Sequence, residues 1–116
     1  MIKRIFQTRA PARDKDTDQR RKNELLDTAN KLIALNQTEI DGLTIRYKLA
    51  QQAAGSILHA LDTDPNNDLE IKLNKHETEI LICEKRLHIL KLQSDFLKAL
   101  SNSINLDFPM TLVKAS

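Results

Sequence analysis

The sequence is poor in aromatic residues, glycine and proline. Its 116 residues include three Phe, one Tyr and no Trp, together with two Gly and three Pro. β-Sheet proteins draw on aromatic and β-branched residues for their strands and on glycine and proline for their turns, so this composition argues against a sheet. Long helices with few turns are expected instead, and the length of the chain favours a single domain.

Long apolar runs and cysteine pairs are also missing. No apolar segment approaches the roughly 20 residues that span a bilayer, so we expect a soluble protein with no membrane among its partners. The apolar stretch near the first residue is too short for a secretory signal. Cys83 is the single cysteine and cannot form an internal disulfide, which is compatible with the cytoplasmic location that we expect.

The residue patterns of common enzyme sites do not occur. His59, His76 and His88 lack the spacing of a zinc site, and two glycines inside a helix cannot form a phosphate-binding loop. His76 and Cys83 are seven residues apart on one helix face, but both fall on predicted packing positions, which favours a packed histidine and thiol over metal ligands. We therefore expect neither an enzyme nor a cofactor or metal site.

Charge is unevenly distributed along the chain. Residues 1–22 contain eight Lys and Arg against three Asp, whereas residues 23–116 contain ten basic against thirteen acidic residues. This asymmetry predicts a basic N-terminal arm over residues 1–16, followed by a mildly acidic body. In the arm, Lys3, Arg4 and Arg9 are interleaved with apolar residues, and the basic residues continue beyond it at Arg20 and Arg21.

Capping and turn signals divide the rest of the chain into two helices. Asp16, Thr17 and Asp18 are candidate N-caps, and the segment DTDPNND over residues 62–68 is typical of a turn. Asn67 and Glu70 then have the form of a capping box, and Pro109 ends the second helix. The prediction is a hairpin over 17–106, with helix one about 18–62, a turn at 63–67, helix two about 68–106, and an extended tail over 107–116.

Apolar residues repeat in heptads along both helices, which predicts one packing seam. Helix one contributes Leu26, Ala29, Ile33, Asn36, Ile40, Leu43, Tyr47, Ala50, Ala54, Ile57 and Leu61. Helix two contributes Leu69, Leu73, His76, Ile80, Cys83, Leu87, Leu90, Ser94, Leu97, Ser101 and Ile104. The segment KLAQQAAGSILHAL, from Lys48 to Leu61, resembles a helix-turn-helix, but the heptad phase continues through Gly55 and favours one unbroken helix.

Folding back around Pro65 would pair residues whose numbers sum to about 130. The one polar seam residue of helix one, Asn36, then faces Ser94, and the small side chains of Ala50 and Ala54 face larger partners. The predicted fold is therefore all-α, a long antiparallel helical hairpin resembling a coiled coil. We expect it to pair with a second hairpin into a four-helix bundle.

A second set of apolar residues lies away from this seam. It comprises Ile71, Ile82, Ile89, Leu92, Phe96 and Leu100 in helix two, with Leu35, Ile45 and Leu49 in helix one. Two interpretations remain open: a structural face covered by another hairpin or by the chain's own ends, or a face that docks another protein. The tail alternates Leu106, Phe108, Met110 and Leu112 with other residues, so it could add to a partner's sheet or return onto its own helices.

These features favour a non-catalytic protein–protein interaction module, such as an adaptor, a chaperone or a small inhibitor, that binds a larger assembly and forms a homodimer. The expected partner-binding residues are Ile82, Ile89, Leu92, Phe96, Leu100, Lys3, Arg4, Arg9, Arg20 and Arg21. One alternative is a nucleic-acid-associated coiled-coil protein that uses the basic arm for phosphate contacts. Another is a purely structural dimeric spacer.

Overall fold

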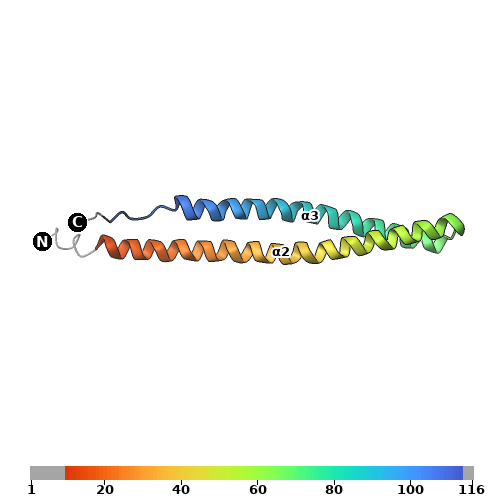
Figure 1. The fold of residues 1–116 in the computed structure, drawn as a ribbon, viewed down its shortest axis with the longest axis horizontal. Coiled ribbons are helices and arrows are strands. Elements are labelled where there is room, and N and C mark those ends of the chain that lie inside the picture. Colours follow the sequence, from red (N-terminus) through yellow and green to blue (C-terminus); the bar gives the residue numbers. More distant parts are fainter. Residues whose placement is uncertain (1–9, 114–116) are drawn as a thin grey trace. The chain divides into compact units, whose positions relative to one another are not determined.

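Two α-helices account for most of the chain. The structure is a computed structural model that describes residues 10–113. Helix α2 spans Pro11–Thr63 (53 residues) and helix α3 spans Asn67–Asp107 (41 residues), labelled as in Figure 1. Over residues 10–113 there is no strand. The predicted all-α helical hairpin is confirmed.

The contacts within the chain define two compact units. Unit 1 comprises Met1–Ile33 and Phe96–Ser116, and unit 2 comprises Ala34–Asp95. Each unit contains a segment of α2 and a segment of α3. Unit 2 also contains the turn between the helices, and unit 1 contains the C-terminal tail.

The helix segments are antiparallel in both units, in the predicted register. In unit 2, Glu39 contacts Arg86 and Tyr47 contacts Glu84, so the paired numbers sum to 125 and 131. In unit 1, Lys22 contacts Asn105 and Asn30 contacts Ser101, with sums of 127 and 131. These values bracket the expected 130.

The heptad seam forms the core of both units. All of the 22 predicted seam residues are buried or half-buried. Cys83 and Leu90 are fully buried, with 0% of their surface exposed, and the small Ala29, Ala50 and Ala54 are buried on α2. Ser94 is also buried, and it is the seam residue that the predicted register places opposite Asn36. The periodicity of the sequence thus identified the residues that hold the hairpin together.

Helix α2 begins at Pro11, seven residues before the predicted start near Asp18. Proline is excluded from a regular helix interior, but a proline at the first helical position loses no hydrogen bond and has a suitable φ. The carbonyl of Ala10 accepts hydrogen bonds from the backbone N–H groups of Arg13 and Asp14. Residues 11–16 of the predicted arm are therefore helical, and residues 1–9 lie outside the described range.

Asn66 caps the start of α3. Its side-chain Oδ1 accepts hydrogen bonds from the backbone N–H groups of Asp68 (2.8 Å) and Leu69 (3.4 Å), the two donors that an N-cap side chain normally satisfies. The predicted cap, Asn67, is instead the first helical residue. Asp68 and Glu70 place negative charge in the first turn, where it interacts favourably with the helix dipole.

The Lys48–Leu61 segment is helical throughout, so the helix-turn-helix alternative is excluded. Neither Gly42 nor Gly55 has a positive φ, and a Cβ atom built on either glycine would meet nothing within 4 Å. Glycine is therefore not required by backbone geometry or by packing inside this chain. At its other end, α3 stops at Asp107, two residues before Pro109, close to the predicted boundary.

Candidate protein-binding surface

In unit 2, the expected partner-binding residues of α3 are exposed. Ile82, Ile89 and Leu92 have 44–56% of their surface accessible. Residues separated by three or seven positions lie on one face of a helix, so these side chains share the side of α3 that faces away from the seam. The structure confirms that they do not contribute to the core.

Helix α2 adds further exposed apolar residues to unit 2. The expected Leu35, Ile45 and Leu49 are all exposed, as are Leu58 on α2 and Ile71 and Leu81 on α3. Gly42 lies midway between Leu35 and Leu49, seven residues from each. The outer surface of unit 2 is therefore apolar on both helices.

Two ion pairs border the seam of unit 2. Arg86 donates from Nε to Glu39 Oε2 at 2.7 Å and from a terminal guanidinium nitrogen to Oε1 at 3.3 Å, and Arg46 pairs with Glu79. The bidentate hydrogen bond from Arg86 lowers the pKa of Glu39, and the carboxylate raises the pKa of Arg86 in return. Both pairs are solvent-exposed, so they fix the alignment of the two helices more than they stabilise the fold.

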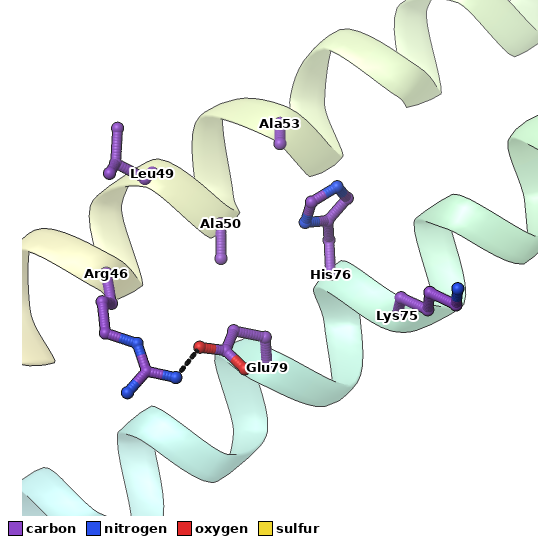
Figure 2. A pocket seen from close by; sticks show the side chains of 7 residues that line it. All are labelled: Arg46, Leu49, Ala50, Ala53, Lys75, His76 and Glu79. Carbon is purple, nitrogen blue, oxygen red and sulfur yellow. Dashed lines mark hydrogen bonds and ion pairs between the residues drawn. The ribbon is translucent and has the colours of Figure 1, made fainter.

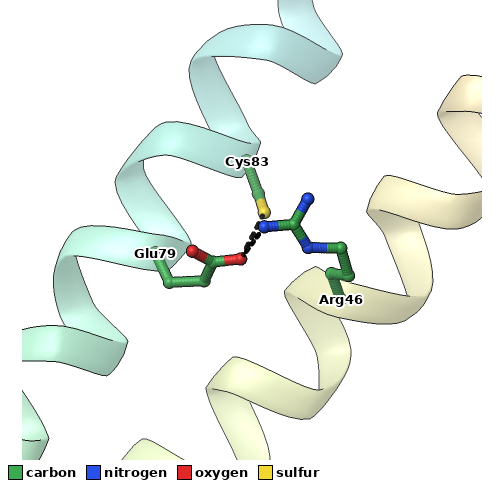
Figure 3. A network of polar contacts seen from close by, with 3 residues as sticks. All are labelled: Arg46, Glu79 and Cys83. Carbon is green, nitrogen blue, oxygen red and sulfur yellow. Dashed lines mark hydrogen bonds and ion pairs between the residues drawn. The ribbon is translucent and has the colours of Figure 1, made fainter.

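Glu79 contacts both an exposed residue beside the seam, Arg46, and a buried residue of the core, Cys83. Its Oε1 accepts from Arg46 and lies 4.0 Å from the Sγ atom of Cys83, as Figure 3 shows. On the rim, the hydroxyl of Tyr47 donates to Glu84 at 2.8 Å, and this bond raises the pKa of Tyr47. Tyr47 thus combines a half-buried ring in the seam with a polar contact at its edge.

A shallow groove of about 530 Å³ lies between the helices of unit 2. Ala50 and Ala53 of α2 line it together with Lys75 and His76 of α3 (Figure 2). The alanine side chains are too short to fill the space on this side of the seam. A second depression, of about 380 Å³, lies on α3 beside Ile71 and also includes Lys75. His76 is half-buried and Cys83 is buried, as expected for packing residues.

In unit 1, the apolar surface includes two leucines that the sequence interpretation missed. Phe96 and Leu100 on α3 are exposed as expected, with 68% and 41% of their surface accessible. Leu25 and Leu32 on α2 are also exposed. Leu25 lies 14 residues before Glu39 and Leu100 lies 14 residues after Arg86, two heptads in each direction, so this pair occupies the same flanking heptad positions as that ion pair.

Two of the expected partner-binding arginines, Arg20 and Arg21, lie next to each other on α2 in unit 1. Arg20 donates to the Thr17 hydroxyl at 3.4 Å, and both Arg20 and Arg21 are exposed. Arg21 is four residues before Leu25, so its guanidinium and that apolar side chain share one helix face. Of the remaining expected partner-binding residues, Lys3, Arg4 and Arg9 lie outside the described range.

The C-terminal tail returns onto α2 in unit 1. Asp18 Oδ2 accepts hydrogen bonds from the backbone N–H of Thr111 at 2.8 Å and from its hydroxyl at 2.6 Å, and these two bonds lower the pKa of Asp18. Lys22 donates to the carbonyl of Asn105 at 3.0 Å, in the last turn of α3, where a cation interacts favourably with the helix dipole.

The contact between Asp18 and Thr111 distinguishes the two expected alternatives for the tail, addition to a partner's sheet and return onto the chain's own helices. Phe108 and Met110 are half-buried, whereas Leu106 and Leu112 are more than four-fifths exposed. The apolar residues of this segment are thus divided between contacts within the chain and solvent. The return of the tail onto the chain's own helices is the alternative that the structure supports.

Neither a membrane-spanning helix nor a cluster of metal ligands occurs in residues 10–113. No helix in this range has a segment apolar enough to cross a membrane. The same residues contain no group of three or more His, Cys, Asp and Glu placed to hold a metal ion. Among known proteins, no family model, curated protein or solved structure is significantly similar to the chain.

Proposed function

We propose that this protein is a non-catalytic interaction module, an adaptor, chaperone or small inhibitor that binds a larger protein assembly. The observation that carries the proposal is the exposure of Ile82, Ile89 and Leu92 in unit 2 and of Phe96 and Leu100 in unit 1. None of these side chains is needed for the seam, yet each presents a large apolar surface to water.

The energetics favour a partner for these residues. Complete burial of one such side chain contributes about 1.5–3 kcal/mol, so removing the remaining half of several of them from water contributes several kcal/mol in total. Large exposed apolar patches on soluble proteins are typical of binding sites. The exposed Arg20 and Arg21, with Lys3, Arg4 and Arg9 of the arm, would favour an acidic region on the partner.

Capture experiments with paired variants test the proposal. Wild-type protein and the double variant Ile89→Asp with Phe96→Asp are immobilised, and the proteins retained from cell extract are quantified by mass spectrometry. We expect the double variant to lose specific partners because it places two charges in the apolar surface. Leu58→Asp is the matched control, since Leu58 is a leucine of similar exposure that lies on α2, outside the proposed set.

Equal retention by the wild type and the double variant would contradict the proposal. Helical content and thermal unfolding of each variant, measured by circular dichroism, establish that the substitutions leave the hairpin folded. The proposal includes a cytoplasmic location, which the single cysteine supports.

Nucleic-acid binding is the second candidate, favoured by the excess of Lys and Arg in residues 1–22. Replacing Arg4, Arg9, Arg20 and Arg21 by Ala discriminates between the two candidates. If the arm binds phosphates, retention on DNA or RNA should fall in this variant, and wild-type retention should fall steeply with salt. Unchanged retention would exclude this candidate and leave the protein-binding proposal untouched.

A further inference from the structure

The groove between the two helices of unit 2 is lined by apolar surface from α2. Ala50 is buried and Ala53 is half-buried, and both line the groove of about 530 Å³. Leu49, with 59% of its surface accessible, lies at the same groove. The ring of His76 reaches from α3 towards α2 beside Ala53 (Figure 2). An apolar side chain of a partner that entered this groove would therefore leave water and contact aliphatic groups of α2.

Lys75 lines two neighbouring depressions of unit 2. Its exposed side chain borders both the groove and the depression of about 380 Å³ that contains Ile71. Half of the surface of Ile71 is accessible, so this second depression also offers an apolar contact. Within residues 10–113, Lys75 makes no hydrogen bond or ion pair. Its ammonium group is thus available to a carboxylate and has apolar surface on either side.

The residues that line these two depressions have a positive net charge. Glu79 is the one acidic residue among them in the described range, and its carboxylate is paired with Arg46. Arg46 and Lys75 against Glu79 give a formal net charge of +1, counting His76 as neutral. Unit 2 as a whole contains seven Lys and Arg against ten Asp and Glu. The positive charge is therefore a local property of this surface, and it favours a negatively charged partner segment.

We propose that this part of unit 2 binds a segment of another protein in which a carboxylate lies between two large apolar side chains. One apolar side chain packs into the groove over Ala50 and Ala53, the other packs against Ile71, and the carboxylate pairs with Lys75. The apolar contacts supply most of the affinity, because exposed ion pairs contribute little, and the charge pair supplies selectivity. This inference rests on the proposed function, since it takes the chain to be a protein-binding module and defines one class of segment that it binds.

Synthetic peptides test the chemistry of the bound segment. The probes are fluorescein-labelled peptides with one Glu between two Leu, at spacings from adjacent to one helical turn, and matched peptides with Gln or Lys in place of that Glu. Fluorescence anisotropy with the full chain measures their dissociation constants. We expect at least one Glu peptide to bind. Its Gln counterpart should bind about two- to fivefold more weakly, because one exposed ion pair is lost, and its Lys counterpart more weakly still.

Variants of the chain test the location of the site. Lys75→Glu should reverse the preference, so that the Lys peptide binds more tightly than the Glu peptide. Such a reversal cannot arise from unfolding of the variant. Ala53→Gln places a longer, neutral side chain in the groove and should weaken the binding of every peptide that binds the wild type.

Two control variants make the same changes outside the site. Lys91→Glu on α3 and Ala60→Gln on α2 alter residues that line neither depression, and both should bind the peptides as the wild type does. Lys91 lies about 24 Å along α3 from Lys75, well beyond the screening length of about 8 Å at physiological salt. Circular dichroism of all four variants measures their helical content.

The outcomes separate this inference from the proposed function. No binding of any Glu peptide, equal binding of the Glu and Lys peptides, an unchanged preference in Lys75→Glu or undiminished binding by Ala53→Gln would overturn the inference. A wild-type dimer that Lys75→Glu converts to a monomer in light scattering would identify a second copy as the occupant and would also overturn it. The proposed function stands in each of these cases if the Ile89→Asp, Phe96→Asp variant loses captured partners. If the peptides bind through Lys75 while that double variant captures every wild-type partner, the inference stands and the surface around Ile89 and Phe96 is excluded.

Discussion

Units 1 and 2 are built on the same heptad seam but differ in the residues that border it. In unit 2 the bordering positions contain the ion pairs of Glu39 with Arg86 and Arg46 with Glu79. In unit 1 the equivalent positions two heptads away contain Leu25 and Leu100, both exposed. The seam specifies the hairpin in both units, whereas the bordering residues determine what kind of surface each unit offers to a partner.

The largest expected effect separates the cores of the two units. Leu90→Ala in unit 2 removes a fully buried side chain and should cost about 2–5 kcal/mol of unfolding free energy. Leu97→Ala in unit 1 alters the next residue at the same heptad position, which is only half-buried, and should cost less. Urea unfolding followed by circular dichroism measures both. The control is Leu92→Ala at an exposed position, whose unfolding free energy should stay within about 0.5 kcal/mol of the wild-type value. Equal losses of unfolding free energy for Leu90→Ala and Leu97→Ala would contradict the comparison.

A second difference is that both glycines of the chain lie in unit 2, on α2. Gly55→Ala should stabilise the helix by about 1 kcal/mol, because alanine has the higher helix propensity and the added Cβ meets open space. Gly42→Ala should give the same gain in a monomer. Thermal unfolding of both variants at several protein concentrations measures these two effects. If a second copy covers the surface around Leu35 and Leu49, the stabilisation by Gly42→Ala should become smaller at protein concentrations at which a dimer forms. The stabilisation by Gly55→Ala should stay the same at all concentrations.

Giving unit 1 the bordering residues of unit 2 tests whether these residues determine the difference between the two surfaces. Leu25→Glu with Leu100→Arg gives unit 1 an ion pair at the position where unit 2 has Glu39 with Arg86. Because both leucines are substantially exposed, the unfolding free energy of the monomer should change by no more than about 0.5 kcal/mol. Captured partners and dimer formation should nevertheless decrease, as measured by mass spectrometry and light scattering. Unchanged binding would show that unit 1 does not use this apolar surface.

The hairpin and its seam could be predicted because heptad periodicity is a local property of the sequence. Each seam side chain is positioned by the helix that carries it, so Cys83 and Leu90 were identified without a structure. The start of α2 was missed because proline is compatible with one helical position and not with later ones. The cap was predicted one residue too late, at Asn67, because Asn66 has the same side chain and only its hydrogen bonds to Asp68 and Leu69 identify it as the cap.

The candidate site was only partly predictable. The exposed residues of α3 followed from their distance from the seam, but Leu25 and Leu32 directly precede the seam residues Leu26 and Ile33 and were overlooked for that reason. Their seven-residue spacing, in phase with Glu39, is the signal that could have identified them. The contact between Asp18 and Thr111 joins residues 93 positions apart, and no local pattern encodes it.

The smallest expected effects concern two carboxylates, one in each unit. The folded-state pKa of Asp18 in unit 1 is held below 3.8 mainly by the Thr111 hydroxyl, and the pKa of Glu39 in unit 2 is held below 4.5 mainly by Arg86. A depressed pKa stabilises the fold at pH values above the unfolded pKa, and this stability is lost as the pH falls through the folded pKa. Both contacts should therefore be stable near neutral pH and weaken as acidification brings the pH through the lowered pKa of each carboxylate.

Carboxyl titration by NMR measures the two groups independently, with reciprocal controls. Thr111→Val removes the hydroxyl donor, so the pKa of Asp18 should rise towards 3.8 while that of Glu39 stays constant. Arg86→Met removes the guanidinium, so the pKa of Glu39 should rise towards 4.5 while that of Asp18 stays constant. A change in both groups with either variant would mean that the two units are coupled. Independent titration would instead mean that the carboxylate contacts of the two units respond to acid separately.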